Sequence, residues 1–170
     1  WARMAASGAT PRATGNPVRD AMRLHRDGCV EEALAALREV LATSPSDARA
    51  RALLSGIEYE ACAGVEGREG DAGRQRALET ADDAAKRAPR DAMVQNALGF
   101  MLLKEAARVA GADDDIAARD EAGSRALVRR AAEACEAAVA AKPTSVAYLT
   151  NLCDALRVDG DRKREAADAY

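Results

Sequence analysis

Aromatic residues are scarce in this chain of 170 residues. One Trp, one Phe and three Tyr make up 3% of it, although hydrophobic residues as a whole reach 48%. Alanine supplies most of the difference, and Ala is the strongest helix former, whereas strands favour β-branched and aromatic side chains. The composition therefore fits closely packed helices far better than a sheet, and it predicts an all-α fold of one domain's length.

Long apolar runs and a surplus of basic residues are also lacking. The longest run without a charged residue, 92–103, is bounded by Asp91 and Lys104 and falls short of the about 20 apolar residues that span a membrane. The formal net charge is -3, the wrong sign for a surface built to neutralise phosphates. We therefore expect a soluble protein with no membrane span, and the charge argues against nucleic acid as a partner.

Metal-binding cysteine motifs are missing. The four cysteines, at positions 29, 62, 135 and 153, form no Cys-x-x-Cys pair, and His25 is the only histidine. This spacing does not match a zinc site, so we expect free thiols and a reducing compartment, either the cytoplasm or the interior of an organelle. Cys135 and Cys153 fall on small-residue positions of the repeat described below, which favours buried structural thiols over a redox role.

Residues arranged for catalysis or cofactor binding are missing as well. The acidic run 113–115 lacks the spread of oxygen ligands and the central Gly of a Ca²⁺ loop, and it suits a helix N-terminus better. His25 has only Cys29 nearby, across a Gly turn. The glycines at 64, 67, 70 and 73 are followed by Arg-Gln-Arg, not by the Lys-Ser/Thr of a phosphate-binding loop. We expect no enzyme, no metal and no cofactor.

Proline occurs only five times, and three prolines share one spacing. In each case an Ala precedes the Pro by twelve residues, and a Leu and a small residue follow it by nine and ten. The three instances are Ala33, Pro45, Leu54-Ser55; Ala77, Pro89, Leu98-Gly99; and Ala131, Pro143, Leu152-Cys153. Small residues permit close helix crossings and a Pro cannot continue a helix, so this spacing indicates one helical hairpin stacked on the next.

The spacing resembles the tetratricopeptide repeat (TPR) family, whose signature is Leu-Gly in a first helix, Ala-x3-Phe in a second and a closing Pro. The second-helix half is represented by Ala33, Leu37 and Pro45; Ala77, Ala81 and Pro89; and Ala131, Cys135 and Pro143. The aromatic position is thus filled by Leu, Ala or Cys. The match covers roughly residues 15 to 165, and it implies a right-handed superhelical stack of antiparallel helical hairpins, an α-solenoid.

The repeat register divides the chain. We expect a flexible tail over 1–16 and a TPR-like domain over 17–170, with repeats at about 14–47, 48–91, 92–145 and a partial one at 146–170. Helices are expected near 17–27, 31–43, 48–63, 73–88, 92–110 and 115–142, from 146, and again over 161–170. The interval between first-helix and second-helix small residues grows from Ala21–Ala33 to Ser55–Ala77 and Gly99–Ala131. We expect the extra residues to form a flexible Gly-rich loop in the second repeat and a helix extension in the third.

The resemblance implies binding of an extended peptide or a partner helix in the concave groove formed by the first helices. The groove would present Arg19, Met22, Arg26, Arg49, Leu53, Tyr59, Asn96, Phe100, Lys104, Asn151, Asp154 and Arg157. The positions of the carboxylate clamp for chaperone tails hold Val18, Met22, Leu53, Met93 and Ala97, so no chaperone tail is expected.

The sequence therefore predicts a non-catalytic protein-protein interaction module, acting as an adaptor or as a docked subunit of a larger complex. The expected partner is a protein or peptide of unknown identity. The predicted contacts combine rings, amides and cations, and they are Tyr59, Asn96, Phe100, Lys104, Asn151 and Arg157. Two alternatives stay open at this stage: an RNA-binding helical repeat, which would need a basic groove, and an accessory subunit of an enzyme.

Overall fold

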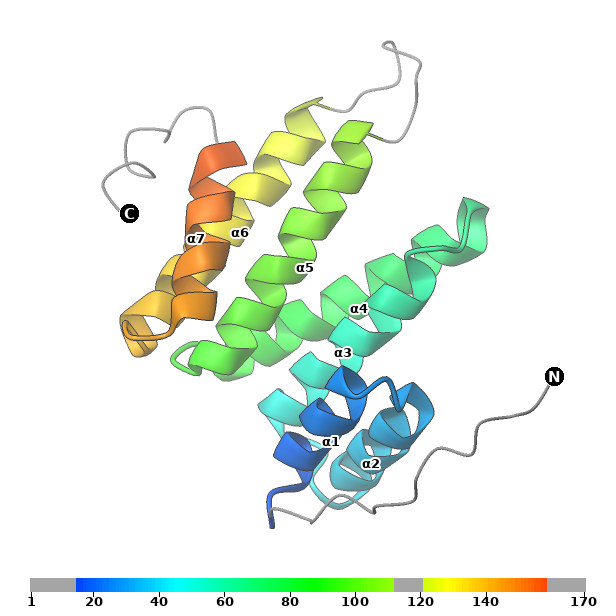
Figure 1. The fold of residues 1–170 in the computed structure, drawn as a ribbon. Helices are drawn as coiled ribbons and strands as arrows, with labels where there is room; N and C mark the ends of the chain where they lie inside the picture. Colours follow the sequence, from blue (N-terminus) through cyan, green and yellow to red (C-terminus); the bar gives the residue numbers. More distant parts are fainter. Residues whose placement is uncertain (1–14, 112–120, 159–170) are drawn as a thin grey trace, which may run out of the picture.

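The computed structural model describes residues 15–111 and 121–158. The helices in these two ranges are α1 (Pro17–Arg26), α2 (Val30–Thr43), α3 (Ala48–Cys62), α4 (Gly67–Arg87), α5 (Ala92–Gly111), α6 (Glu121–Ala141) and α7 (Val146–Val158). Within the same ranges there is no strand, which confirms the all-α prediction there. Figure 1 shows three hairpins that follow one another, α1–α2, α3–α4 and α5–α6, with α7 packed beside the last of them.

The three repeat prolines mark the turns between hairpins. Pro45, Pro89 and Pro143 each lie two residues beyond the end of a helix, in the connections 44–47, 88–91 and 142–145. The next helix is capped where Asp47 accepts the Ala50 N–H at 2.9 Å and where Asp91 accepts the N–H groups of Met93 and Val94 at 3.1 and 3.2 Å. Proline ends one helix and a carboxylate starts the next, so the local sequence fixes these boundaries.

The small residues of the repeat lie in the core, as predicted. Ala33, Ala77, Ala131 and Cys153 are all buried. At Gly99 the backbones of α5 and α6 approach so closely that an added Cβ would lie 2.5 Å from the Cys135 Sγ and 3.2 Å from the Ala131 carbonyl oxygen. Side chains must be small for helices to pack at this separation, which explains how the chain builds a core with few rings.

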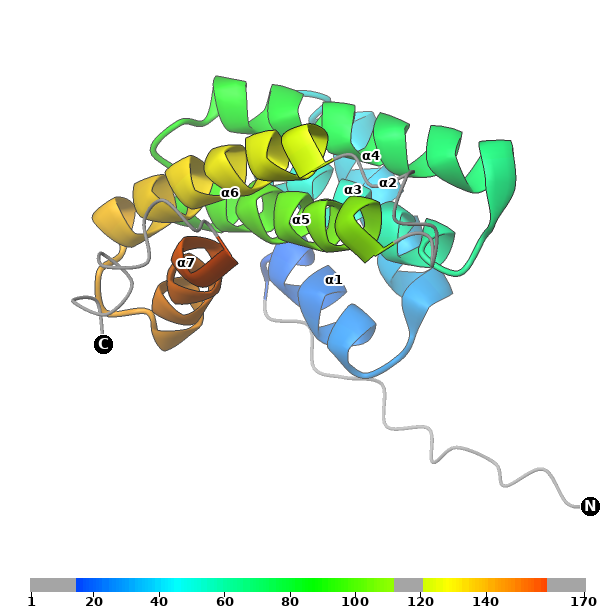
Figure 2. The ribbon, with the colours of Figure 1, turned by 90° about the horizontal axis from the view of Figure 1, so that it is seen from above.

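Contacts between helices follow the order of the chain. Among the odd-numbered helices α1 contacts α3, α3 contacts α5 and α5 contacts α7, while α2, α4 and α6 each pack against the helices next to them in sequence. Figure 2 shows α1 and α7 on the same side of α5, with α4 on the opposite side. The helices expected to line a groove are therefore brought together.

The connection between α3 and α4 differs from the expected flexible loop. α4 begins at Gly67 and continues through Gly70 and Gly73, both of which are buried. A Cβ at Gly70 would collide with the Val65 carbonyl, and one at Gly73 would collide with the Cys62 side chain. The glycines permit the start of α4 to pack against the end of α3. The prediction of a mostly mobile loop was wrong, because this insertion is mainly helix.

The third insertion is confirmed in part. α5 extends to Gly111, as expected for a helix extension. The expected start of the next helix near 115, the capping role of 113–115, the tail over 1–14 and the helix over 161–170 lie outside the described residues. Of the helices in the described ranges, none combines the length and the apolar character that crossing a membrane requires.

Candidate functional site

A pocket of about 340 Å³ opens between α1, α3, α5 and α7. We call it the apolar pocket, and its lining includes Met22 of α1, Leu53 of α3, Met93 and Phe100 of α5, and Tyr148 of α7. Met22 is 43% exposed and Phe100 is 38% exposed, so two large apolar side chains face solvent at one depression. The odd-numbered helices meet at this pocket because α1 and α7 flank α5 on one side (Figure 2).

One edge of the apolar pocket is charged. The Lys104 ammonium lies 4.8 Å from the centre of the Phe100 ring, a cation–π geometry, and 3.8 Å from the Glu60 Oε1. The other oxygen of Glu60, Oε2, lies 3.2 Å from the His25 Nε2. Glu60 therefore lies between a side chain of α1 and a side chain of α5, and the three residues connect three helices at this edge.

Asn96 and Asn151 join α5 to α7. The Asn151 Nδ2 donates to the Asn96 Oδ1 at 2.9 Å, and both amides are half-buried. Asn96 lines the apolar pocket, whereas Asn151 is not part of the lining and contacts Asn96. One hydrogen-bonding group on each amide is thus used within the protein, and the pair fixes how α7 lies against α5.

Tyr59 occupies the floor of the apolar pocket. Only 2% of the residue is exposed, and its hydroxyl donates to the Glu105 Oε2 at 2.8 Å. Burial is the largest cause of a strongly raised pKa for Tyr59, followed by the hydrogen bond to Glu105 and its negative charge. The ring can contribute to the pocket wall, while the hydroxyl is held by the protein interior.

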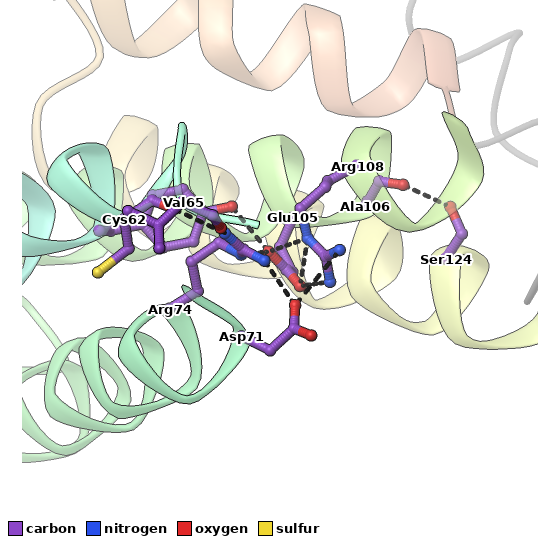
Figure 3. Close-up of polar contacts among 9 residues, drawn as sticks. Cys62, Val65, Asp71, Arg74, Glu105, Ala106, Arg108 and Ser124 are labelled. Atoms are coloured by element: carbon purple, nitrogen blue, oxygen red, sulfur yellow. Dashed lines mark hydrogen bonds and ion pairs between the residues drawn. The ribbon is translucent and has the colours of Figure 1, made fainter. Parts of the chain in front are cut away.

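Glu105 belongs to a polar cluster between α4 and α5, which Figure 3 shows together with Asp71, Arg74 and Arg108. Arg108 Nη2 donates to Glu105 Oε1 at 2.7 Å, and Arg74 Nε lies 3.9 Å from Glu105 Oε2. Burial alone would raise the pKa of Glu105, but hydrogen bonds from Arg108 and Tyr59 and the nearby guanidinium charges lower it below its usual value. Glu105 therefore stays ionised at neutral pH.

Arg74 holds the end of α3. It is buried, and its Nη1 donates to the carbonyl oxygens of Cys62 at 2.6 Å and Val65 at 3.2 Å, as Figure 3 shows. Cys62 is the last residue of α3 and Val65 lies in the connection to α4, and the end of a helix leaves carbonyl oxygens that need partners. The cluster of charged residues therefore supports the floor of the apolar pocket and the α3–α4 connection together.

A second hollow, of about 690 Å³, continues from the apolar pocket and shares Met22, Met93 and Tyr148 with it. We call it the basic groove because five basic side chains line it: Arg19, Arg23, Arg26, Arg49 and Lys142. Asp91 also lines the groove, and its Oδ2 accepts a hydrogen bond from the Arg49 Nε at 2.6 Å. Basic residues exceed acidic ones at this end of the surface.

The structure brings most of the predicted contacts together. Tyr59, Asn96, Phe100 and Lys104 line the apolar pocket, and Asn151 touches Asn96. Arg157, in the last turn of α7, lies away from both hollows and pairs with Asp154 at 3.8 Å. Sequence reasoning missed Tyr148, Lys142 and the His25–Glu60 contact. Tyr148 carried a signal, since it is an aromatic residue in the first turn of a first helix.

No group of three or more His, Cys, Asp or Glu side chains in the described ranges lies close enough together to hold a metal ion. The Cys135 thiol is buried in the α5–α6 contact, and its burial raises the pKa of Cys135 to about 12. Such a thiol is protonated at neutral pH, which is the opposite of an activated nucleophile.

Comparisons with known proteins add little. No model of a protein family matches the chain, and no curated protein matches it in sequence. Among solved structures, one described as "MamA RS-1 ArsTM double mutant" is similar over 92% of this chain and 92% of that one, at 24% sequence identity and a TM-score of 0.38. At that TM-score the likeness carries no argument, so the function must be inferred from the geometry described above.

Proposed function

We propose that the chain is a divergent TPR-like α-solenoid, a right-handed stack of hairpins, that acts as a non-catalytic protein-protein interaction module. It serves as an adaptor or as a docked subunit of a larger complex. The observation that supports this most is the apolar pocket, because it lies between the four first helices and exposes Met22 and Phe100. A depression lined by an aromatic ring and flexible methionines is typical of surfaces that bind protein side chains.

The chemistry of the apolar pocket favours binding over catalysis. Of its ionisable side chains at the surface, His25 and Lys104 both contact Glu60, and no Ser, Thr or Cys is among the described residues that line it. A nucleophile within reach of a base is the usual requirement for covalent catalysis. The polar cluster around Glu105 is explained by structure alone. Buried charges need partners of opposite charge, and Glu105 is paired with Arg74 and Arg108.

The experiment is affinity capture with quantitative mass spectrometry, using the full chain as bait. Phe100→Ala removes the exposed ring from the apolar pocket, and Val158→Ala is the matched control, because Val158 is 62% exposed at the end of α7. We expect Val158→Ala to recover the parent's partners and Phe100→Ala to lose them by about tenfold, the scale of a hot-spot truncation. Candidate partners are then purified and titrated against the same three proteins.

A second bait tests the polar side of the same surface. Asn96, Lys104 and Asn151 are all replaced by Ala, and circular dichroism checks that the helices remain. Loss of capture would support the proposal. Full recovery of partners by both this variant and Phe100→Ala would overturn it, because the surface between the first helices would then not be the binding site.

A further inference from the structure

The charges on the surface formed by the apolar pocket and the basic groove indicate which kind of ligand it binds. Along the basic groove, Arg19 and Lys142 are exposed. Arg26 is 77% exposed at its side chain and its Nε lies 3.9 Å from the Asp27 Oδ1, while Arg23 pairs with Asp20 at 3.2 Å. The one acidic residue among the described side chains that line the groove, Asp91, is already engaged by Arg49 and by the two backbone N–H groups that it caps. Even with Asp20 and Asp27 counted, the five basic side chains outnumber three acidic ones, and those of Arg19, Arg26 and Lys142 face the solvent.

This local surplus contrasts with the whole chain, which has a formal net charge of -3. Acidic residues must outnumber basic ones on the rest of the protein, so a positive groove is a local feature and not a consequence of composition. Charge clustered in a concave surface attracts ligands of the opposite sign and orients them as they approach.

The basic groove and the apolar pocket form one continuous surface. Met22, Met93 and Tyr148 line both of them, so a ligand lying in one reaches the other without leaving the protein. Apolar side chains fit one half of the surface, and carboxylates fit the other half. A ligand that carries both kinds of group side by side matches the surface better than one that carries either alone.

We propose that this surface binds an acidic segment of a partner protein, with an apolar side chain of the segment in the apolar pocket and its carboxylates along Arg19, Arg26 and Lys142. This rests on the proposed function and adds the chemical class of the partner. The first residues of the chain itself are a poor occupant, because 1–14 contains Arg3 and Arg12 and no acidic residue.

RNA is the competing anionic ligand. Single-stranded RNA is usually held by basic residues along the whole groove together with a series of rings on which bases stack. Here five basic residues cluster along the basic groove, and apart from Lys104 at its edge the apolar pocket is formed largely by Met, Leu, Ile and Ala, with Phe100 exposed and Tyr148 half-buried. The apolar pocket therefore favours a protein segment.

The test measures binding of fluorescein-labelled peptides by fluorescence anisotropy. The probe is a ten-residue peptide with two Leu residues flanked by Glu and Asp, and it is compared with one in which Lys replaces every acid and one in which Ser replaces each Leu. We expect both altered peptides to bind at least about tenfold more weakly. Raising NaCl from about 50 to about 300 mM should weaken binding of the acidic probe several-fold.

Charge-reversed proteins locate the site. The test variant carries Arg19→Glu, Arg26→Glu and Lys142→Glu, and the control carries Arg76→Glu, Arg125→Glu and Arg129→Glu, three exposed arginines of α4 and α6 with the same change in net charge. We expect the test variant to lose about tenfold or more in affinity for the acidic probe and the control to lose about twofold or less. Lys142 lies outside the helices, so Lys142→Glu alone should not disturb the fold. We expect this single variant to lose several-fold in affinity for the acidic probe.

The outcomes test the acidic ligand separately from the protein-protein interaction module. Equal affinity for the acidic and the Lys-containing probe, or unchanged affinity in folded Lys142→Glu and the triple variant, overturns the acidic partner. Tighter binding of a labelled single-stranded oligouridylate than of the acidic probe, lost in the same variants, overturns it in favour of RNA. If capture of a protein partner depends on Phe100 and not on the three basic residues, the interaction module stands and its acidic ligand does not.

Discussion

Gly99 is the residue at which one added carbon has the largest effect on packing. A Cβ there would meet the Cys135 Sγ and the backbone of α6. We expect Gly99→Ala to lower the free energy of unfolding by about 1 to 3 kcal/mol through overpacking, and Gly99→Leu to lower it further. Urea titration followed by circular dichroism measures this.

Gly56 is the control for that substitution. It also lies inside a helix, α3, but a Cβ there would find no heavy atom within 4 Å. Gly56→Ala should therefore leave the free energy of unfolding unchanged or raise it by up to about 1 kcal/mol, because Ala favours helix. Equal stability of the two Ala variants would contradict the close approach of α5 and α6.

The lowered pKa of Glu105 predicts that the free energy of unfolding depends on pH. Its lowered pKa means that the ionised carboxylate stabilises the folded state above the usual Glu pKa, and that this stabilisation disappears as pH falls through the lower folded value. Glu105→Gln should cost about 1 to 3 kcal/mol at pH 7. The gap between parent and variant should narrow in urea titrations below about pH 4.5, the ordinary value for Glu.

Glu133→Gln serves as the control, since Glu133 is exposed on α6. It should change the free energy of unfolding by less than about 0.5 kcal/mol at either pH. A constant gap for Glu105→Gln across the acidic range would show that its charge does not contribute as described.

Sequence reasoning placed some site residues and missed others for physical reasons. Asn96, Phe100 and Lys104 follow one another at four-residue steps on α5, so the helical period alone puts them on one face. The partner of the Tyr59 hydroxyl is 46 positions away in sequence, and no local pattern reveals it. Lys142 of the α6–α7 turn and Tyr148 of α7 line the same groove as residues of α1, which lie more than 100 positions away in sequence, and repeat spacing does not specify this meeting.

At the scale of elements, the start of α4 shows where composition misleads. Four glycines in ten residues lower helix propensity. Helix forms nevertheless, because Gly70 packs against the Val65 carbonyl of the connection, Gly73 packs against Cys62 of α3, and Arg74 donates to the carbonyls of Cys62 and Val65. The turns 44–47, 88–91 and 142–145 were predictable, because Pro and a capping residue are local signals. Tertiary contacts thus override local helix propensity at the start of α4, whereas at the three turns the local sequence and the structure agree.

Gly70→Ala tests the helical start of α4. The added Cβ would collide with the Val65 carbonyl, so we expect a loss of about 1 to 3 kcal/mol in the free energy of unfolding and faster hydrogen exchange in the first turns of α4. Gly64→Ala is the control, because a Cβ there would meet nothing within 4 Å. Equal exchange rates in the two variants would restore the loop interpretation.

At the scale of the whole molecule, each helix contacts mainly its neighbours in the chain. α5 contacts α3, α4, α6 and α7, whereas α1 contacts α2 and α3, and α7 contacts α5 and α6. In an array of this kind local stability depends on the number of packed neighbours. We expect native-state hydrogen exchange, read by mass spectrometry, to be slowest in α5 and faster in α1 and α7. Slowest exchange in α1 would contradict this order.

The turns between hairpins have one length, but the first helices do not. α1, α3 and α5 contain 10, 15 and 20 residues, and α7 contains 13; the first three are thus about 15, 22 and 30 Å long at the rise of an α-helix. The helices along which a partner would lie therefore lengthen from α1 to α5 and are shorter again at α7. A chain lying across α1, α3 and α5 would meet progressively longer helices in one direction and progressively shorter ones in the other, so the two directions of such a chain are not equivalent on this surface.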